Sequence, residues 1–463
     1  MTQVPVQNSG VTHPAAERIA ALDVARGMAL FVVCLAHFFN MYFLDPHAQK
    51  NVLTVTLYDL TKIAIPMFML VSSIVLGYHC SVPRHDSLQF RVHQFDRALF
   101  LLTAGHLLIS ASNLARLGFP TALLEGQVTD TIALCIMGSL LLFPYTTAAT
   151  RVQLGLVLYL ISWVGWLCWS PDDRMLQVLK GVFFGHEDTE AAIYFFPLLP
   201  WFAVYVGGAS IGEWLSRFDR VTRARAGKQL ATRAGVVLCA TVLLYGALRV
   251  VLSVFPPAGL MDMSARIRWL ISPFHKDPPG LFYLLVFGST ALLVIGCAIW
   301  KMGELHTERN LGHFRYLRIL EQVGKNSLPL FILQFVIYYL VFFLVVTRTQ
   351  LVTPARAALF LLLSLLGIAA LGGLCEHLRI HRAWTVGLPA LTKRWPILTR
   401  SLLATAPADQ LRILSGSGET YAEKMVKGRS YERNDELMQE TLRPEATHEQ
   451  IIYQNVVGLK SRE

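Results

Sequence analysis

The sequence predicts an all-α fold, a polytopic integral membrane helix bundle of about ten transmembrane helices with both termini in the cytoplasm. The first observation is composition: 54% of the 463 residues are hydrophobic and only 16% are charged, whereas a soluble protein has about a quarter charged residues. The second is distribution. The charges gather in gaps between apolar runs of roughly 17–25 residues, the length that crosses a bilayer core as a helix.

The apolar runs set the expected helices in order. They predict spans at 19–43, 62–80, 98–114, 131–148, 152–170, 191–215, 234–254, 281–300, 327–346 and 357–377.

The distribution of Lys and Arg predicts the orientation of these spans. With a cytoplasmic N-terminus, the four inner loops carry fifteen Lys and Arg residues and the five outer loops carry ten. Inner loops of membrane proteins are enriched in these residues. The bias, together with an even number of spans, favours two cytoplasmic termini.

The chain divides into three parts by composition. Residues 1–18 are polar and lack the basic start, apolar core and cleavage site of a signal peptide, so we expect the first helix to be an uncleaved span. Residues 19–378 form the transmembrane domain. Residues 379–463 begin with a basic segment suited to anionic lipid headgroups and continue as a polar cytoplasmic tail.

Several chemistries have no support in the sequence. The seven cysteines show no CxxC or Cys/His metal spacing, so we expect neither a disulfide framework nor a metal site. The net charge of +10 lies in short loops between spans, which indicates membrane orientation and not nucleic-acid binding. Walker A, GxSxG and HExxH motifs do not occur.

The first predicted helix carries three ionisable residues within an apolar span, Asp23, Arg26 and His37. Such residues are expensive in lipid and normally face the bundle interior or a wet cavity. Arg26 and His37 are eleven residues apart, nearly three full helical turns, so both point the same way about 16 Å apart. Asp23 lies one turn before Arg26 and can pair with it.

This geometry suggests an elongated ligand. Arg26, near the cytoplasmic end, would hold a phosphate, and His37, deeper in the membrane, would meet a thioester and act as general base on an acceptor hydroxyl. The structural alternative is that Arg26 only pairs with Asp23 and His37 only satisfies a buried carbonyl. For each residue alone the structural alternative is favoured, but for the constellation at this spacing we favour function.

The same stretch resembles the start of the acyltransferase-3 family of membrane acyltransferases. Residues 22–27, LDVARG, match the family's LDxxRG motif, and Arg26 and His37 match its R-x10-H pair. Residues 65–73, IPMFMLVSS, look like its FFxLSG segment with Ser73 in place of the glycine. Arg97 matches the basic entry to its third helix.

Related segments resemble the heparan-glucosaminide N-acetyltransferase group of the same clan. Residues 196–201, FPLLPW, look like that group's FPLLPW helix, and residues 45–59 resemble its catalytic loop, with His47 on the active-site histidine. Residues 324–328, GKNSL, resemble a late G-x-N-S-L segment of both groups. A histidine usually follows that serine by about seven residues, but the position is Gln334 here.

The resemblance implies an acyltransferase of the cell membrane, the cytoplasmic or inner membrane. It would move an acyl group, an acetyl group by first choice, from acyl-CoA to a sugar, glycan or glycolipid acceptor. His37 and His47 are the alternative catalytic residues, and Arg26, Arg97 and Asp23 would serve the acyl-CoA site. The expected partners are membrane lipids, acyl-CoA and the carbohydrate acceptor, with no nucleic acid and no permanently bound cofactor.

Two other functions fit the same composition. A transporter or exporter of a glycan or lipid would use Arg26 and His37 as intramembrane substrate or proton sites. A membrane scaffold would use residues 405–463 as a partner-binding arm. Transport without acyl-CoA, or loss of function on deletion of the tail, would distinguish these from acyl transfer.

Overall fold

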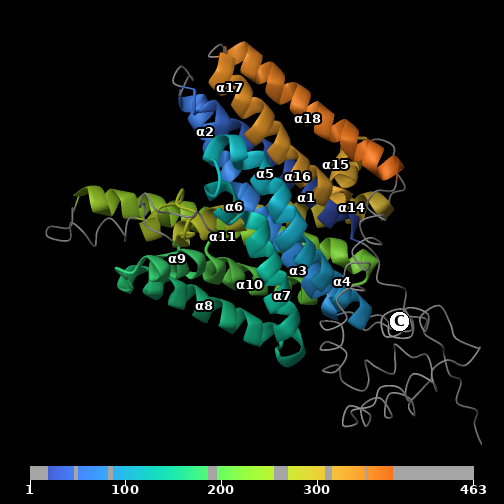
Figure 1. The fold of residues 1–463 in the computed structure, drawn as a ribbon. Helices are drawn as coiled ribbons and strands as arrows, with labels where there is room; N and C mark the ends of the chain where they lie inside the picture. The colour runs from blue at the N-terminus through green and yellow to red at the C-terminus, as the bar shows by residue number, and fades with distance from the viewer. Residues whose placement is uncertain are drawn as a thin grey trace, which may run out of the picture.

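The fold is a bundle of helices, seen in a computed structural model that describes residues 19–45, 51–81, 87–185, 196–254, 269–307, 315–349 and 353–378. Every regular element in these ranges is a helix and no strand forms there (Figure 1). The predicted all-α polytopic bundle is therefore confirmed. The segments 1–18 and 379–463 lie outside the described residues, and the orientation of the termini stays a prediction.

The helices follow one another with short connections. In chain order they are α1 (Ala20–Tyr42), α2 (Val52–Leu60), η1 (Thr61–Ile63), α3 (Ala64–Ser81), α4 (Ser87–Phe100), η2 (Leu101–Gly105), α5 (His106–Leu117), α6 (Thr121–Leu124), α7 (Val128–Leu142), η3 (Phe143–Tyr145), α8 (Ala148–Cys168), α9 (Arg174–Phe183), α10 (Leu198–Ser216), α11 (Arg220–Val254), α13 (Leu281–Tyr283), η4 (Leu284–Gly288), α14 (Ser289–Thr307), α15 (Arg315–Lys325), α16 (Ser327–Phe335), η6 (Val336–Phe342), α17 (Phe343–Thr349) and α18 (Pro354–His377).

The expected spans correspond closely to these helices. Within the described part of the chain, nine helical segments are long and apolar enough to cross a membrane. The remaining expected span, 191–215, corresponds to α10, a central helix in which three glycines and Glu213 lower the apolar content. We treat it as a span because it packs along α3 and α8.

One expected inner loop is helical instead. The basic residues between 220 and 233 belong to α11, which begins well before the expected span at 234. Alanine, arginine, lysine and glutamine dominate this stretch and are strong helix formers. Asp219 caps the helix, because its side chain accepts a hydrogen bond from the backbone N–H of Thr222 at 2.8 Å.

The core is built around α1, which contacts α3, α14, α15 and α16 (Figure 1). Its contact with α15 is backbone to backbone. A Cβ on Gly27 would lie 2.0 Å from the carbonyl oxygen of Leu320, and a Cβ on Gly324 would lie 1.7 Å from that of Asp23. Small residues at such crossings allow close packing of membrane helices.

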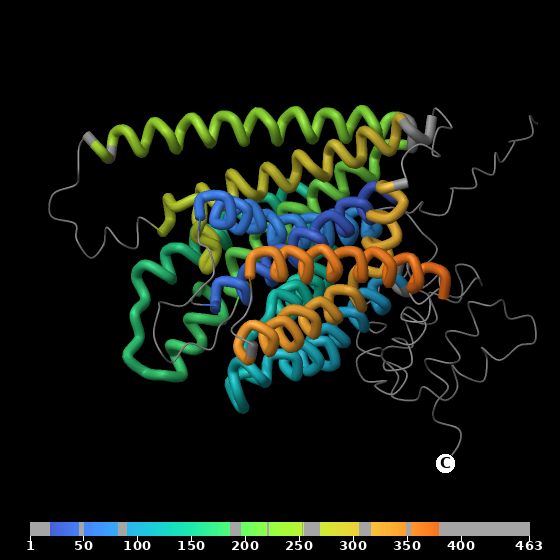
Figure 2. The backbone as a smooth tube through the Cα atoms, turned by 90° about the horizontal axis from the view of Figure 1, so that it is seen from above, coloured from blue at the N-terminus to red at the C-terminus, as the bar shows by residue number. Residues whose placement is uncertain are grey.

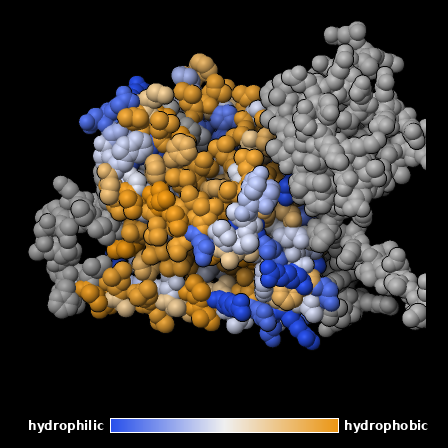
Figure 3. Space-filling model, turned by 90° about the horizontal axis from the view of Figure 1, so that it is seen from below, coloured by the Kyte–Doolittle hydropathy of each residue, from blue (hydrophilic) through white to orange (hydrophobic). Residues whose placement is uncertain are grey.

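The periphery presents apolar side chains outward. The spans of α11 and α18 are the least buried of the nine candidate spans, each with 11% of its most apolar window inside the protein. Figure 2 shows α11 as the long yellow-green helix along one edge, beside α14. The face in Figure 3 is largely hydrophobic, as expected for a surface that faces lipid, and its hydrophilic residues gather at the upper left and in a band toward the lower right.

Candidate functional site

A cavity of about 390 Å³ lies at the end of the bundle where α1 and α5 terminate and α3 and α7 begin. Its walls come from α1, the junction of α2 with α3, the end of α5, the start of α7, α16 and η6. Pockets of about 300–1,000 Å³ bind small organic ligands. The aromatic side chains that line this one are Tyr58, Phe68, Phe196, Phe331, Phe335 and Tyr339.

His37 lies in the wall of this cavity, near the end of α1. Its ring packs against Phe335 and Tyr339, with centroids 4.8 and 4.9 Å away. Its Nδ1 atom lies 2.6 Å from Oε1 of Gln334 on α16, a fully buried side chain. The position at which the family resemblance leads one to expect a histidine therefore holds an amide in direct contact with the first-helix histidine.

This contact determines what the imidazole can do. An amide oxygen only accepts hydrogen bonds, so in this orientation Nδ1 of His37 carries the proton. The neutral ring then has a free lone pair on Nε2. A histidine whose second nitrogen is held in this way can act as a general base.

A polar group lies one turn beyond His37. Asn40 accepts a hydrogen bond from the Tyr58 hydroxyl at 2.9 Å through Oδ1, and its amide donates to the Tyr339 hydroxyl at 3.5 Å. Tyr339 belongs to η6, a segment of π-helix. Such segments often occur at functional sites. The group joins α1, α2 and η6 around the cavity.

The cations in the wall are each paired with a carboxylate. Arg116 donates to Glu125 at 3.3 Å and lies over the Tyr339 ring at 5.2 Å. Lys62 lies 2.8 Å from Asp59. The third cation, Lys276, lies 3.7 Å from the carboxylate of the next residue. The positive charges in the wall are therefore largely compensated, and the remaining lining is mostly apolar.

Asp23 and Arg26 lie at the other end of α1. Arg26 donates to the buried carboxylate of Asp23 at 2.7 Å, as expected from the sequence. Neither residue lines the cavity. The eleven-residue separation places Arg26 about 16 Å along the axis from His37, beside the close contact of Gly27 with α15.

The other two candidate residues lie elsewhere. Arg97 is on α4, next to the buried Asp96 and within electrostatic range of Tyr205 on α10. The helices that carry Arg26 and Arg97 both contact α3, and Arg97 is not in the cavity wall. His47 lies outside the described residues, so its predicted role stays a prediction.

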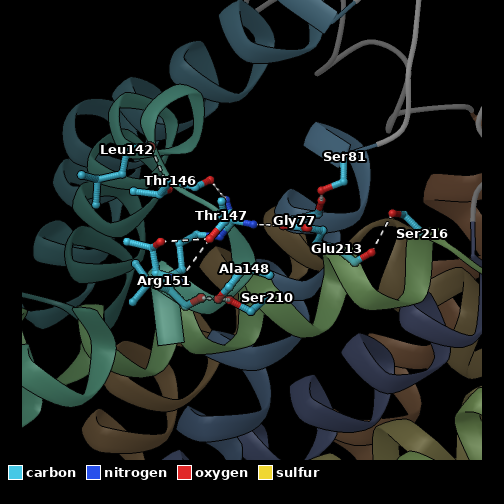
Figure 4. A network of polar contacts seen from close by, with 12 residues as sticks. Gly77, Ser81, Leu142, Thr146, Thr147, Ala148, Arg151, Ser210, Glu213 and Ser216 are labelled. Atoms are coloured by element: carbon cyan, nitrogen blue, oxygen red, sulfur yellow. Dashed lines mark hydrogen bonds and ion pairs between the residues drawn. The ribbon is translucent and has the colours of Figure 1, made fainter. Parts of the chain in front are cut away.

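A second polar network lies away from the cavity, between α8 and α10 (Figure 4). The buried Arg151 forms an ion pair with Glu213 and donates to the Thr146 carbonyl at 3.0 Å. Ser210 donates to the Ala148 carbonyl at 3.1 Å. Because these contacts join two packed helices, we interpret the network as structural.

Sequence reasoning singled out Arg26 and His37 but missed most of the cavity wall. Asn40 follows His37 by three residues and so shares its face, a signal that was available. Gln334 contacts His37 without lining the cavity, and the sequence had already drawn attention to it at the position of the expected late histidine. Arg116 and Lys276 carry no local signal, because only tertiary packing brings them to His37.

The comparison with protein families finds one match. Residues 18–245 match the family described as heparan-alpha-glucosaminide N-acetyltransferase, catalytic. Over these residues the chain is similar to a membrane acetyltransferase. The match contains α1 with Arg26 and His37, and it ends before α16 with Gln334. No curated protein and no solved structure matches the chain.

The family match and the bundle of apolar helices are consistent with each other. A catalytic family of this type indicates an acyl- or acetyltransferase that acts on a glycan-like acceptor. Its apolar helices make the protein a multi-pass membrane protein.

Proposed function

We propose that this protein transfers an acyl group, an acetyl group in the first instance, from acyl-CoA to a hydroxyl or amine of a carbohydrate or glycolipid acceptor. His37 carries the proposal. It is the histidine in the wall of the cavity, and its contact with Gln334 leaves Nε2 free to take a proton. The resemblance of the first helix to the acyltransferase-3 family supports the same chemistry.

The acyl donor would approach from the end of α1 that carries Arg26. The guanidinium group suits a phosphate of CoA, because it donates in a fixed fork. Asp23 holds that group in place, and Arg97 is the second candidate for phosphate binding. A pantetheine arm has about the ~16 Å reach from Arg26 to His37.

The acceptor would occupy the cavity. Its aromatic rings offer flat apolar surfaces, and Asn40, Asn113 and Gln127 offer amide donors and acceptors. The paired cations leave the wall near neutral. These properties suit a polar ligand rich in hydroxyl groups, with a few placed polar contacts that fix its orientation.

The reaction would take place across or at the cell membrane. If the N-terminus is cytoplasmic, Arg26 faces the compartment that contains acyl-CoA, and the cavity opens toward the opposite side. His47, ten residues after His37 in the sequence, is the rival base suggested by the family resemblance and is tested together with His37.

The test uses the full-length protein in proteoliposomes with radiolabelled acetyl-CoA and a panel of neutral and amino sugars, free and lipid-linked. We expect label to move to an acceptor. His37→Ala should reduce kcat at least 100-fold, in line with general-base catalysis of about 10²–10⁴-fold. Arg26→Gln should raise KM for acetyl-CoA with a smaller change in kcat.

The control is His377→Ala, a histidine at the exposed end of α18, which should keep wild-type kinetics. Full activity in both His37→Ala and His47→Ala would refute the proposed base. Movement of the unmodified glycan across the bilayer without acyl-CoA, and with no label transferred, would show transport instead.

A further inference from the structure

The cavity reaches the surface of the protein just beyond the end of α1. Leu44, two residues after that helix, lines the cavity and has 50% of its surface exposed. Tyr58 of α2 lines the same cavity, and so do Glu125 and Gln127 from the connection between α6 and α7. Helices α2 and α6 both lie toward this end of the bundle (Figure 1). The two short helices therefore belong to the rim of the cavity.

Helix α2 exposes apolar side chains. Val52 is 85% exposed, Leu53 and Leu60 are exposed as well, and none of the nine residues of the helix is buried. Its one charged residue, Asp59, lies 2.8 Å from Lys62 in the segment that joins α2 to α3. Exposed apolar patches of this kind mark surfaces that contact a membrane or another protein. Because α2 continues without a break into α3, a candidate membrane span, the membrane is the contact that the chain itself provides.

The rim on the side of α6 is apolar too. Phe119, in the turn before α6, is 77% exposed, and Leu124 at the end of α6 is also exposed. These side chains continue an exposed apolar surface on α5, which includes Leu107 and Leu114. Helix α5 belongs to a candidate membrane span, so its exposed leucines face lipid. The continuity of the two surfaces places this part of the rim at the level of the membrane.

The length of α1 gives the depth of the cavity. Its 23 residues extend about 35 Å, slightly more than the ~30 Å hydrocarbon core of a bilayer. Leu44 therefore lies near the boundary between acyl chains and headgroups. His37 precedes the last residue of α1 by about 8 Å along the axis. A glycolipid holds its sugar at this boundary, so the sugar reaches His37 by moving about 8 Å inward while its tail stays among the acyl chains.

Resting on the proposed function, we propose that the acceptor is a lipid-linked sugar that enters from the membrane, with its sugar in the cavity and its tail in the leaflet beside α2 and α6. The amides and hydroxyls of the wall contact the sugar. Leu44, where the cavity meets the surface, contacts the atoms that join the sugar to the tail. A cavity that received its acceptor from water would instead need a polar rim.

The test compares the methyl and hexadecyl glycosides of glucose and of glucosamine as acceptors, in proteoliposomes with radiolabelled acetyl-CoA. The hexadecyl chain anchors the same sugar in the bilayer. We expect the wild-type kcat/KM to be about tenfold or more higher for the hexadecyl glycoside. Because partition into the bilayer also concentrates this acceptor, a variant decides the question. Leu44→Gln should raise KM for the hexadecyl glycoside about threefold to tenfold, the effect of losing part of one leucine contact, and change KM for the methyl glycoside less than about twofold.

Leu141→Gln on α7 is the matched control, because that leucine is 65% exposed and lies outside the cavity wall. It should leave both KM values unchanged. Elution of each variant as a single species in detergent excludes misfolding, and a Leu44→Gln protein that fails is replaced by Leu44→Ala.

Two results would overturn the lipid-linked acceptor. One is equal kcat/KM for the methyl and hexadecyl glycosides, and the other is an equal change in both KM values in Leu44→Gln. A dimer in detergent that Leu53→Gln dissociates would assign α2 to a contact between two copies of the chain and would overturn its placement in lipid. A wild-type protein that acetylates none of the glycosides would refute the proposed function, and this inference with it.

Discussion

The contact between α1 and α15 can be tested with a single methyl group at Gly27. A Cβ built there would lie 2.0 Å from the carbonyl oxygen of Leu320 and 2.8 Å from its carbonyl carbon. A carbon and an oxygen in contact are about 3.3 Å or more apart. Gly27→Ala therefore forces the two helices apart by more than about 1 Å, because the obstacle is backbone and no side chain can rotate away.

The destabilisation caused by Gly27→Ala is the difference between two opposing terms. Inserting a group into a well-packed core costs about 1–3 kcal/mol, and a backbone obstacle places Gly27→Ala near the upper end. Replacing a helical glycine by alanine returns about 0.5–1 kcal/mol through the unfolded chain. We expect a net destabilisation of about 2 kcal/mol from these two estimates.

The matched control is Gly207→Ala on α10, where a Cβ would meet nothing within 4 Å. This variant should be equally stable or more stable than the wild type. The assay is the apparent melting temperature in detergent at a fixed heating rate, since unfolding of such proteins is generally irreversible. A Gly27→Ala protein that melts at the wild-type temperature, or a larger loss for Gly207→Ala, would refute the close contact of α1 with α15.

Two further substitutions test the polar contacts. Arg151→Met removes the cation that pairs with Glu213 and should destabilise the protein by about 1–3 kcal/mol in the same melting assay. The control is Arg217→Met; because the Arg217 side chain is 65% exposed, this variant should change stability by less than about 0.5 kcal/mol. Equal losses of stability in the two variants would argue against a structural network between α8 and α10. Tyr58→Phe removes a hydroxyl that donates a 2.9 Å hydrogen bond in the cavity wall and should raise KM for the acceptor about threefold to tenfold, the equivalent of one hydrogen bond, while KM for acetyl-CoA stays constant. The control Tyr145→Phe lies at an exposed site, and an acceptor KM that Tyr58→Phe leaves unchanged would exclude Tyr58 from acceptor binding.

Much of the fold could be predicted from the sequence because the bilayer restricts the choices. A long apolar run must be a helix, since lipid offers no partner for backbone groups. The start of a helix was harder to predict where polar helix formers precede the apolar span. Helix α11, for example, begins at Arg220, within the expected basic loop, and continues into the span. The short helix α2 was missed, because its nine residues are too few to span a membrane.

The candidate site could be predicted only in part. Arg26 and His37 are visible because they share one helix and one face, so helical spacing relates them directly. The contact of His37 with Gln334 joins positions 297 residues apart, and no periodic pattern in one chain encodes such a distance. The cavity itself depends on how six segments pack, which is decided by side-chain volumes in three dimensions.

The two ends of α1 differ in a way that suits a two-substrate reaction. At Gly27 the helix touches α15 through backbone atoms, which fixes the position of the neighbouring Arg26. At His37 the neighbours are large aromatic rings, whose shapes do not close the space and leave a cavity. One rigid helix thus sets the distance between the proposed phosphate-binding group and the proposed base, and rigid elements hold reacting groups more accurately than loops do. A substrate of fixed length, such as a pantetheine thioester, is the kind of ligand that such a fixed distance would select.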